Sequence, residues 1–186
     1  MNWGTCYYDH FVNYLGSPVD RHTFEQNKND LTIQILAFDG VFEACRVFCL
    51  LGLSHYTSEL NALGEVYMVL DDGWEEVPYL LANALFFMVQ QKMQLGWGIS
   101  IDGIRNISPS LAQTFDKSAL YLTTPFNLPD TFKHVSGAQK TGDMYLGVCI
   151  SREEEAFLKD REAEALESVC AEKNIDPFSL RRVSCV

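Results

Sequence analysis

The sequence predicts an α+β fold: a mixed, mainly antiparallel β-sheet packed with a central buried helix at about 78–94 and a long C-terminal helix at about 152–173. Three observations predict it. Tyr79 to Met93 is apolar nearly all round, as in a helix that is covered on most sides. Short apolar and β-branched runs recur along the chain with turn residues between them. Ser151-x-x-Glu154 is a capping box that opens a helical stretch with an acidic first turn.

Length and composition indicate one domain spanning residues 1–186. The chain has 186 residues, is 47% hydrophobic and contains no internal repeat or low-complexity linker. Its net charge is −11, which argues against binding to nucleic acids or anionic membranes and favours a basic protein partner. These properties do not decide between a monomer and a homodimer.

The N-terminal residues show no signal peptide, because no basic region precedes an apolar run. No stretch of about 18 apolar residues is uninterrupted, so we expect no membrane span. The expected location is the cytoplasm.

The six cysteines are scattered through the chain. Cys149 lies in an apolar run and Cys170 on a helical face, which suits small buried hydrophobic residues. Three residues separate Cys45 from Cys49, whereas zinc and redox motifs have two, and no histidine pair lies nearby. We therefore expect no metal site and no cofactor.

In the N-terminal part, residues 5–16 have helical spacing of their apolar positions, and Gly16 and Pro18 end the helix. Residues 21–30 are polar and charged, which predicts a loop. The run 31–38 alternates, with Leu31, Ile33, Ile35 and Ala37 on one face, as in a half-buried strand. Asp39-Gly40 is typical of a turn.

Further runs predict strands at 45–53, 64–70, 99–101, 119–124 and 144–150. The polar segments between them predict connections at 54–62, 106–117 and 136–143, with a proline turn at 125–129.

The segment Gly96-Trp97-Gly98 marks a predicted corner between the central helix and the next strand. Gly96 suits the left-handed residue that ends a helix. We expect Trp97 to be a core residue that fills the corner.

One surface segment is a candidate contact site. Asp71-Asp72-Gly73-Trp74-Glu75-Glu76 places four acids around an aromatic ring. One interpretation is structural: a turn followed by carboxylates at a helix N-terminus. The other is a partner-binding patch of Asp71, Asp72, Trp74, Glu75 and Glu76, an aromatic anchor inside an acidic rim.

Motifs of catalysis are missing from the sequence. It has no G-x-S-x-G elbow, P-loop, H-E-x-x-H or G-x-G-x-x-G after a strand, and its four histidines are dispersed. A cysteine–histidine pair could still meet in space. We therefore expect that the protein is not an enzyme and that it functions by binding another molecule.

The chain resembles the suppressor of fused (SUFU) domain family. The resemblance lies in the order of several pieces along almost the whole chain. These are LTIQILAF (31–38), L-G-L-S (51–54), GEVYMVL (64–70), L-G-W-G (95–98), ALYLTTPFNLP (119–129), MYLGVCISREE (144–154) and I-D-P…R-V (175–183).

The resemblance implies a stand-alone, bacterial-type α+β domain without known catalysis. Family members often carry proline pairs where this chain has Asp39-Gly40 and Asp71-Asp72. Eukaryotic members also have a second domain that helps to clamp a partner's peptide, and 186 residues leave no room for it. Partner-contact residues are therefore not carried over.

Two functions are compatible with these observations. Small bacterial members look like immunity proteins (antitoxins) that neutralise a cognate polymorphic toxin, and an acidic protein suits a basic toxin domain. The alternative is an adaptor that sequesters a regulatory partner by gripping a short peptide at a sheet edge or apolar groove.

Overall fold

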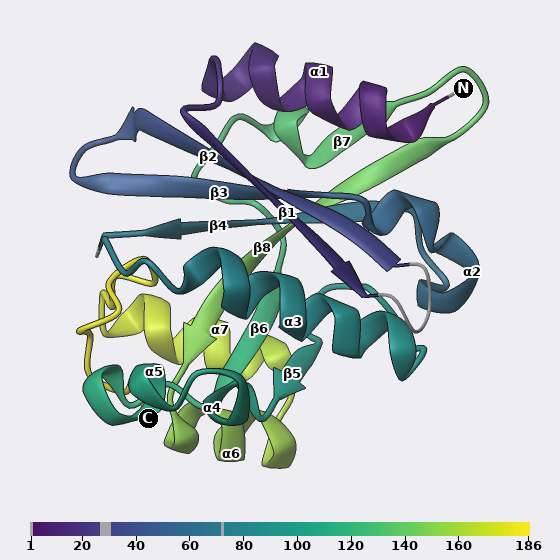
Figure 1. The fold of residues 1–186 in the computed structure, drawn as a ribbon. Helices are drawn as coiled ribbons and strands as arrows, with labels where there is room; N and C mark the ends of the chain where they lie inside the picture. The colour runs from purple at the N-terminus through teal and green to yellow at the C-terminus, as the bar shows by residue number, and fades with distance from the viewer. Residues whose placement is uncertain (1, 27–30, 72) are drawn as a thin grey trace.

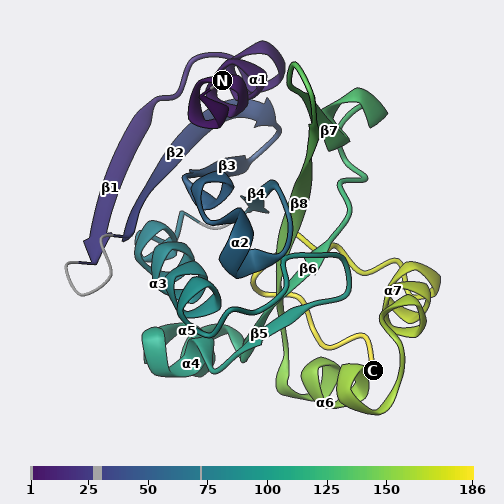
Figure 2. The same ribbon diagram turned by 90° about the vertical axis from the view of Figure 1, so that its right-hand side faces the viewer.

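A single β-sheet runs through the molecule, with helices on both of its faces (Figures 1 and 2). The computed structural model describes residues 2–26, 31–71 and 73–186. Within that part of the chain, the sheet has eight strands in the order β1-β2-β3-β4-β8-β6-β5, and β7 also pairs with β8. β4 and β8 are parallel and the other pairs are antiparallel, so the prediction of a mixed, mainly antiparallel sheet is confirmed.

The strands are β1 (Asp20–Gln26), β2 (Leu31–Phe42), β3 (Cys45–Leu51), β4 (Gly64–Leu70), β5 (Ser100–Asp102), β6 (Ala119–Thr123), β7 (His134–Ser136) and β8 (Thr141–Ile150). The α-helices are α1 (Trp3–Leu15), α2 (Thr57–Leu60), α3 (Val77–Gln90), α4 (Ile104–Ile107), α5 (Pro109–Phe115), α6 (Arg152–Asp160) and α7 (Ala163–Glu172). Short 3-10 helices occupy Leu53–His55 and Asp130–Lys133.

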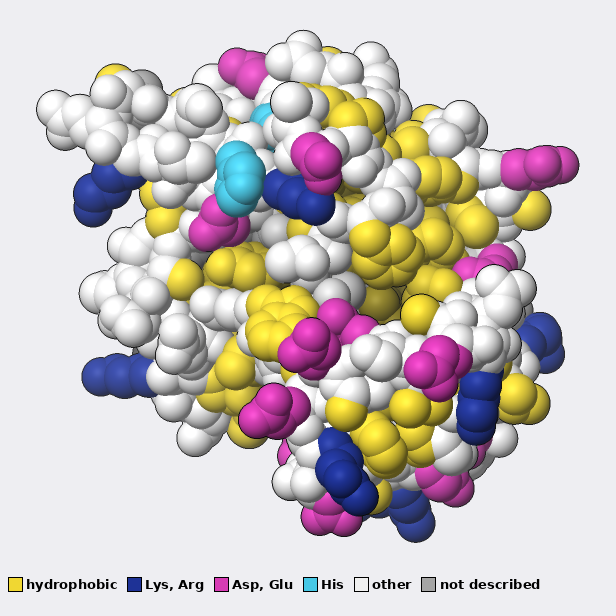
Figure 3. All heavy atoms as spheres, turned by 180° about the vertical axis from the view of Figure 1, so that it is seen from behind, with side chains coloured by type: hydrophobic (Ala, Val, Ile, Leu, Met, Phe, Trp, Pro, Cys, Tyr) yellow, Lys and Arg dark blue, Asp and Glu magenta, His cyan; other side chains and the backbone are white. Residues whose placement is uncertain are grey.

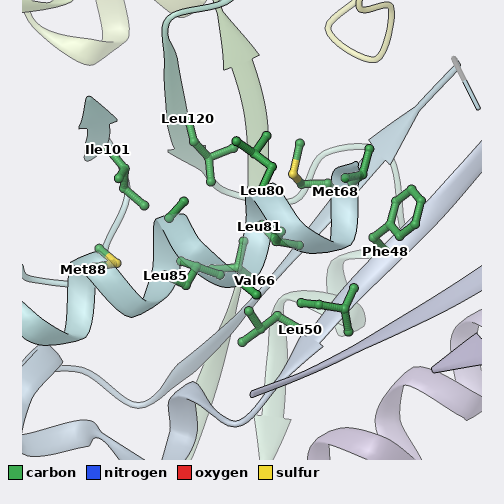
Figure 4. Packing of buried hydrophobic residues seen from close by; sticks show 14 of the residues in the cluster. Phe48, Leu50, Val66, Met68, Leu80, Leu81, Leu85, Met88, Ile101 and Leu120 are labelled. Atoms are coloured by element: carbon green, nitrogen blue, oxygen red, sulfur yellow. The ribbon is translucent and has the colours of Figure 1, made fainter. Parts of the chain in front are cut away.

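The two faces of the sheet carry separate hydrophobic cores, because successive strand residues point to opposite faces. On one face, Leu31, Ile33, Ile35 and Ala37 of β2 pack in the cluster that contains α3, as their alternation predicts. Figure 4 shows side chains of α3 lying against those of β3 and β4. On the other face, α1 and the start of α7 pack against the opposite side chains of the same strands.

The central helix is confirmed, but its end differs from the prediction. α3 is buried over most of its length and ends at Gln90. Lys92, with φ 51°, takes the left-handed conformation, whereas Gly96 does not have a positive φ. The expectation that Gly96 ends the helix is wrong. The apolar residues after Gln90 continue the core cluster outside the helix, and Leu95 is buried in it.

Two N-terminal predictions are also wrong. Residues 20–26 form β1, an edge strand whose only pairing is with β2. An edge strand tolerates polar residues because one side faces water, so its composition looked like that of a loop; residues 27–30 of the predicted loop lie outside the described residues. Asp39-Gly40 is a bulge inside β2 rather than a turn, because the pairing register shifts between Asp39 and Phe42.

The predicted long C-terminal helix at 152–173 is two helices. The capping box is confirmed, with both of its hydrogen bonds present at Ser151 and Glu154. α6 ends after Asp160, and Arg161 and Glu162 are extended, with ψ 167° and 155°. The break lets the chain change direction, so that Ala163 and Leu166 of α7 are buried. The start of α7 carries no capping signal in the sequence, because its N-cap residue, Glu162, makes no side-chain cap.

A buried carboxylate organises the Leu51–Ser54 segment. Glu65 of β4 is fully buried and accepts hydrogen bonds from the backbone N–H groups of Gly52, Leu53 and Ser54 at 2.9–3.0 Å. Gly52 has φ 141°, and a Cβ there would lie 2.9 Å from the Thr32 carbonyl oxygen. The L-G-L-S motif therefore forms a backbone cradle for Glu65.

None of the helices in the described residues has the length and apolar character needed to cross a membrane.

Candidate functional site

The predicted patch lies between β4 and α3, and its residues have different tasks. Asp71 anchors the C-terminal tail: its Oδ1 accepts the Leu180 N–H at 3.1 Å, and its own N–H donates to the Phe178 carbonyl at 3.1 Å. Asp72 lies outside the described residues. Glu75 is exposed and accepts no hydrogen bond from any residue that the structure describes.

Trp74 and Glu76 face the neighbouring helices. The half-buried Trp74 ring meets the Phe115 ring edge-on at 6.3 Å. Glu76 Oε2 accepts the hydroxyls of Ser108 and Ser110 at 2.6 and 2.9 Å, which lowers the pKa of Glu76. Both residues therefore stabilise the packing of α3 against α5, and the assignment of the patch to partner binding stays a prediction.

An open hollow of about 810 Å³ lies beside this segment, and we call it the acidic hollow. Its lining includes Asp39, Phe42, Glu43, Cys45, Arg46, Asp71 and Glu75. Arg46 is the one cation among the described residues of the lining, and it is neutralised because it pairs with Asp39 through two contacts at 2.7 and 2.9 Å. Burial raises the pKa of Cys45, and the nearby Asp176 and Asp71 raise it further. The hollow therefore has a negative electrostatic potential, and the Cys45 thiol is a weak nucleophile.

A second depression, which we call the apolar groove, lies between α7 and strands β6 and β8. Its volume is about 340 Å³. The lining is Tyr121, Thr123, Thr124, Phe126, Val148, Ile150, Leu166, Glu167, Cys170, Ala171, Ile175, Pro177 and Arg182. Figure 3 shows hydrophobic side chains gathered around a hollow on this side of the molecule, with acidic side chains beside it.

Glu167 holds one end of the apolar groove. Its Oε1 accepts hydrogen bonds from Trp97 Nε1, the Tyr121 hydroxyl and the Thr123 hydroxyl at 2.9, 2.7 and 2.6 Å. Burial, and then the hydrogen bond to Glu167, raise the pKa of Tyr121. Trp97 is 47% exposed, so the expectation of a core tryptophan is wrong. Its indole N–H needs a partner, and Glu167 supplies it.

Long-range bonds hold the opposite wall. Cys170 of α7 is joined to Cys185 by a disulfide, which corrects the expectation that Cys170 is a simple buried hydrophobe. Glu154 is fully buried and accepts hydrogen bonds from Arg182 and from the N–H of Cys185. Burial alone would raise the pKa of Glu154, but the hydrogen bond and charge of Arg182 outweigh it and lower that pKa.

Stacked aromatic rings connect the two depressions. The Phe178 ring stacks on Phe126 at 5.9 Å and on Phe42 at 6.2 Å. Phe126 lines the apolar groove and Phe42 lines the acidic hollow. The two depressions and the phenylalanine bridge thus form one continuous surface, anchored through Phe178 to the predicted Asp71.

The buried cysteines and the one close group of possible metal ligands in the described residues have other partners or high pKa values. Burial raises the pKa of Cys149 to about 12 and that of Cys49 well above its usual value, so both are poor nucleophiles. No hydrogen bond joins a cysteine to a histidine within the described residues. Glu154, Cys170 and Cys185 lie close enough to share a metal ion, but the two sulfurs are bonded to each other and Glu154 is paired with Arg182.

Comparisons place this three-layer α+β fold among known proteins. The chain superimposes on the crystal structure of a SUFU homologue from Neisseria gonorrhoeae FA 1090 with a TM-score of 0.76 and 16% identity, covering 99% of this chain and 97% of the other. A second solved structure, of a Sufu–Fu complex, matches with a TM-score of 0.67 and 14% identity over 97% and 91% of the two chains. No curated protein matches the sequence.

The family model described as suppressor of fused protein (SUFU) matches residues 29–183. The chain therefore belongs to the SUFU family, as its motifs indicate.

Proposed function

We propose that this protein is a non-catalytic immunity protein that binds and neutralises a basic toxin domain in the cytoplasm. The observation that carries the proposal is the acidic hollow, where Glu43, Asp71 and Glu75 line a depression in which Arg46, the one cation of its described lining, is paired with Asp39. The net charge of −11 extends the same sign over the whole molecule.

Electrostatics explains why such a surface suits a toxin of this kind. A nuclease toxin needs positive charge to hold phosphate groups, so its active face is the part that an acidic protein attracts. Opposite charges accelerate the encounter, and the bound immunity protein then blocks the substrate groove. Asp71, Asp72, Trp74, Glu75 and Glu76 belong to this proposed contact surface.

The alternative is an adaptor that grips a short peptide of a regulatory partner. Two observations favour it: the sheet ends at the three-residue edge strand β5, and one structural relative is a Sufu–Fu complex. A peptide could add a strand to such an edge. A basic toxin domain encoded next to this chain would favour immunity, whereas a regulatory protein would favour the adaptor.

Co-expression tests the proposal directly. The C-terminal domain of the protein encoded by the adjacent gene is expressed with and without this chain, and growth is measured. We expect that domain to arrest growth alone and growth to recover with this chain. A domain that is harmless alone, or one that this chain does not neutralise, would remove the immunity function.

Charge-reversal variants test the surface. Glu43→Lys combined with Glu75→Lys should slow association with the toxin domain about tenfold at low salt and weaken its salt dependence. Glu153→Lys combined with Asp160→Lys, two exposed acids of α6, makes the same change in net charge and is the matched control. Equal association rates for the two double variants would remove the acidic hollow from the contact surface.

A further inference from the structure

We propose that the apolar groove, with Phe126 and Phe178 at its mouth, is the anchoring site for a protein segment that presents apolar side chains between lysine or arginine residues. This inference deepens the proposed function, because it names the part of the surface and the chemistry of the segment that binds there.

The groove exposes apolar area in a concave site. Phe126 is 58% exposed although it stacks on Phe178, and it borders the groove. Of the residues that line the groove, only Glu167 and Arg182 are charged. A contiguous apolar surface that is concave and has a polar rim is typical of a binding site. A volume of about 340 Å³ suits one or two side chains rather than a large ligand.

The walls of the groove are held in place by covalent and polar bonds. The Cys170–Cys185 disulfide ties α7 to the C-terminal tail, and the buried Glu154–Arg182 ion pair ties the same tail to α6. Glu167 holds strand β6 and Trp97 through three hydrogen bonds. A groove whose walls are already fixed loses little conformational entropy when a segment binds, which favours affinity.

The charges around the groove are complementary to a cationic segment. The charge of the Arg182 guanidinium is paired with Glu154 through its two terminal nitrogens, one of which also donates to the Cys149 carbonyl, and its remaining Nε–H donor is buried. The three groups that donate to the Glu167 carboxylate all bind Oε1. Its Oε2 accepts no hydrogen bond from a residue that the structure describes. At the other end of the groove, two aspartates contact Phe178: Asp176 Oδ1 accepts the Phe178 N–H, and the Asp71 N–H donates to the Phe178 carbonyl. An apolar centre between carboxylates fits an apolar segment with ammonium or guanidinium groups on both sides.

Three short peptides test this inference without any toxin. The protein labelled with ¹⁵N is titrated with acetyl-Lys-Leu-Phe-Lys-amide, acetyl-Glu-Leu-Phe-Glu-amide and acetyl-Lys-Ser-Ser-Lys-amide, up to about 5 mM, and the amide shifts are followed by NMR. We expect the first peptide to give saturable shifts in residues 121–126 and 166–178. The second and third should bind at least about fivefold more weakly, since each lacks one of the two features.

Variants separate the two features. Phe126→Ala should weaken the first peptide about tenfold, because a large apolar contact is lost. Tyr79→Ala is the matched control, since Tyr79 is 53% exposed on α3, which packs on the other face of the sheet. Glu167→Gln keeps a hydrogen-bond acceptor but removes the charge, so it should reduce the preference for the lysine peptide over the glutamate peptide. Thermal unfolding of each variant checks that it is folded.

Four results would overturn the inference: no saturable shifts in the groove, shifts centred elsewhere, equal affinity for the first two peptides, or an unchanged affinity of the Phe126→Ala variant. A wild-type dimer that becomes a monomer on Phe126→Ala, measured by sedimentation equilibrium, would also overturn it, because a second copy would then cover the groove. The peptide titration and the growth assay can fail separately, so the failure of one does not imply the failure of the other.

Discussion

The acidic hollow and the apolar groove adjoin on one surface, yet they are built in different ways. The hollow is made of short local stretches, mainly residues 39–46, 70–71 and 73–75, with exposed charges at its edge. The groove is made of side chains from residue 121 to residue 182, brought together by a disulfide and a buried ion pair. The charge of this surface is therefore adjustable at little structural cost, whereas the shape of the groove is part of the fold.

Breaking the buried ion pair should have the largest effect. Arg182→Met leaves the fully buried Glu154 without its cation, which should lower the free energy of unfolding by about 3 to 5 kcal/mol. Urea unfolding measures the loss. Arg46→Met is the control, because the Asp39–Arg46 pair at the hollow is about half exposed and should cost less than about 1 kcal/mol. Equal losses would contradict the contrast between the two sites.

The pH dependence sharpens the same point. In the wild type the pKa of Glu154 lies below its usual value, so its contribution to stability is present above the unfolded-state pKa and is lost as pH falls through the folded-state pKa. Without Arg182, burial should raise that pKa instead. The difference in stability between wild type and Arg182→Met should therefore be largest near neutral pH and shrink toward pH 4 or so, near the unfolded-state value. A constant difference would argue against Glu154 as the cause.

Removing the disulfide should have the next largest effect. Cys170→Ser with Cys185→Ser opens a loop with a sequence separation of 15 residues, and we expect a loss of about 3 kcal/mol in the free energy of unfolding. Urea unfolding with and without a reducing agent measures it, and the reduced wild type should resemble the double variant. Cys45→Ser, at the hollow, is the control: it removes a free cysteine and keeps the disulfide, so reduction should lower its stability as much as that of the wild type.

A smaller effect is expected at the predicted patch. Ser108 is buried, caps α5 through the Leu111 N–H and donates to Glu76. Ser108→Ala should lower the free energy of unfolding by about 1 kcal/mol, which is typical of a lost helix cap. Ser110→Ala, which removes the other hydroxyl bound to Glu76 and not the cap, is the control. A larger loss for Ser110 would show that Glu76, rather than the cap, stabilises this corner.

The smallest effect on stability is expected for the edge of the hollow. Glu43→Ala with Glu75→Ala should leave the free energy of unfolding within about 0.5 kcal/mol of the wild type, since both side chains belong to an open surface. Thermal and urea unfolding check this. A clear loss of stability would mean that these acids serve the fold and are not available for binding alone.

The parts of the fold that follow from local patterns could be predicted from the sequence. The alternation of residues 31–38, the apolar helix α3 and the capping box at Ser151 each depend on neighbours in the chain. The break between α6 and α7 could not be predicted in this way, because it is stabilised by burial of Ala163 in the core cluster of the distant strands and by burial of Leu166 beside the groove. β1 was missed because an edge strand can be as polar as a loop.

The candidate site shows the same division. The acids at 71–76 are adjacent in the sequence, so their clustering was visible, but their separate tasks depend on Leu180, Phe115 and Ser108. The groove left no local signal. The one clue is Trp97 between two glycines: the sequence predicts a core residue there, whereas its ring lies at the surface beside Glu167.

Amide hydrogen exchange on the complex with the toxin domain of the adjacent gene tests the central claim most directly. We predict slower exchange in residues 119–126, 166–178 and 73–76 on binding, because the groove, the phenylalanine bridge and the acidic hollow would be covered together. Slower exchange confined to β1 and the outer side of α3, with these three segments unchanged, would contradict it.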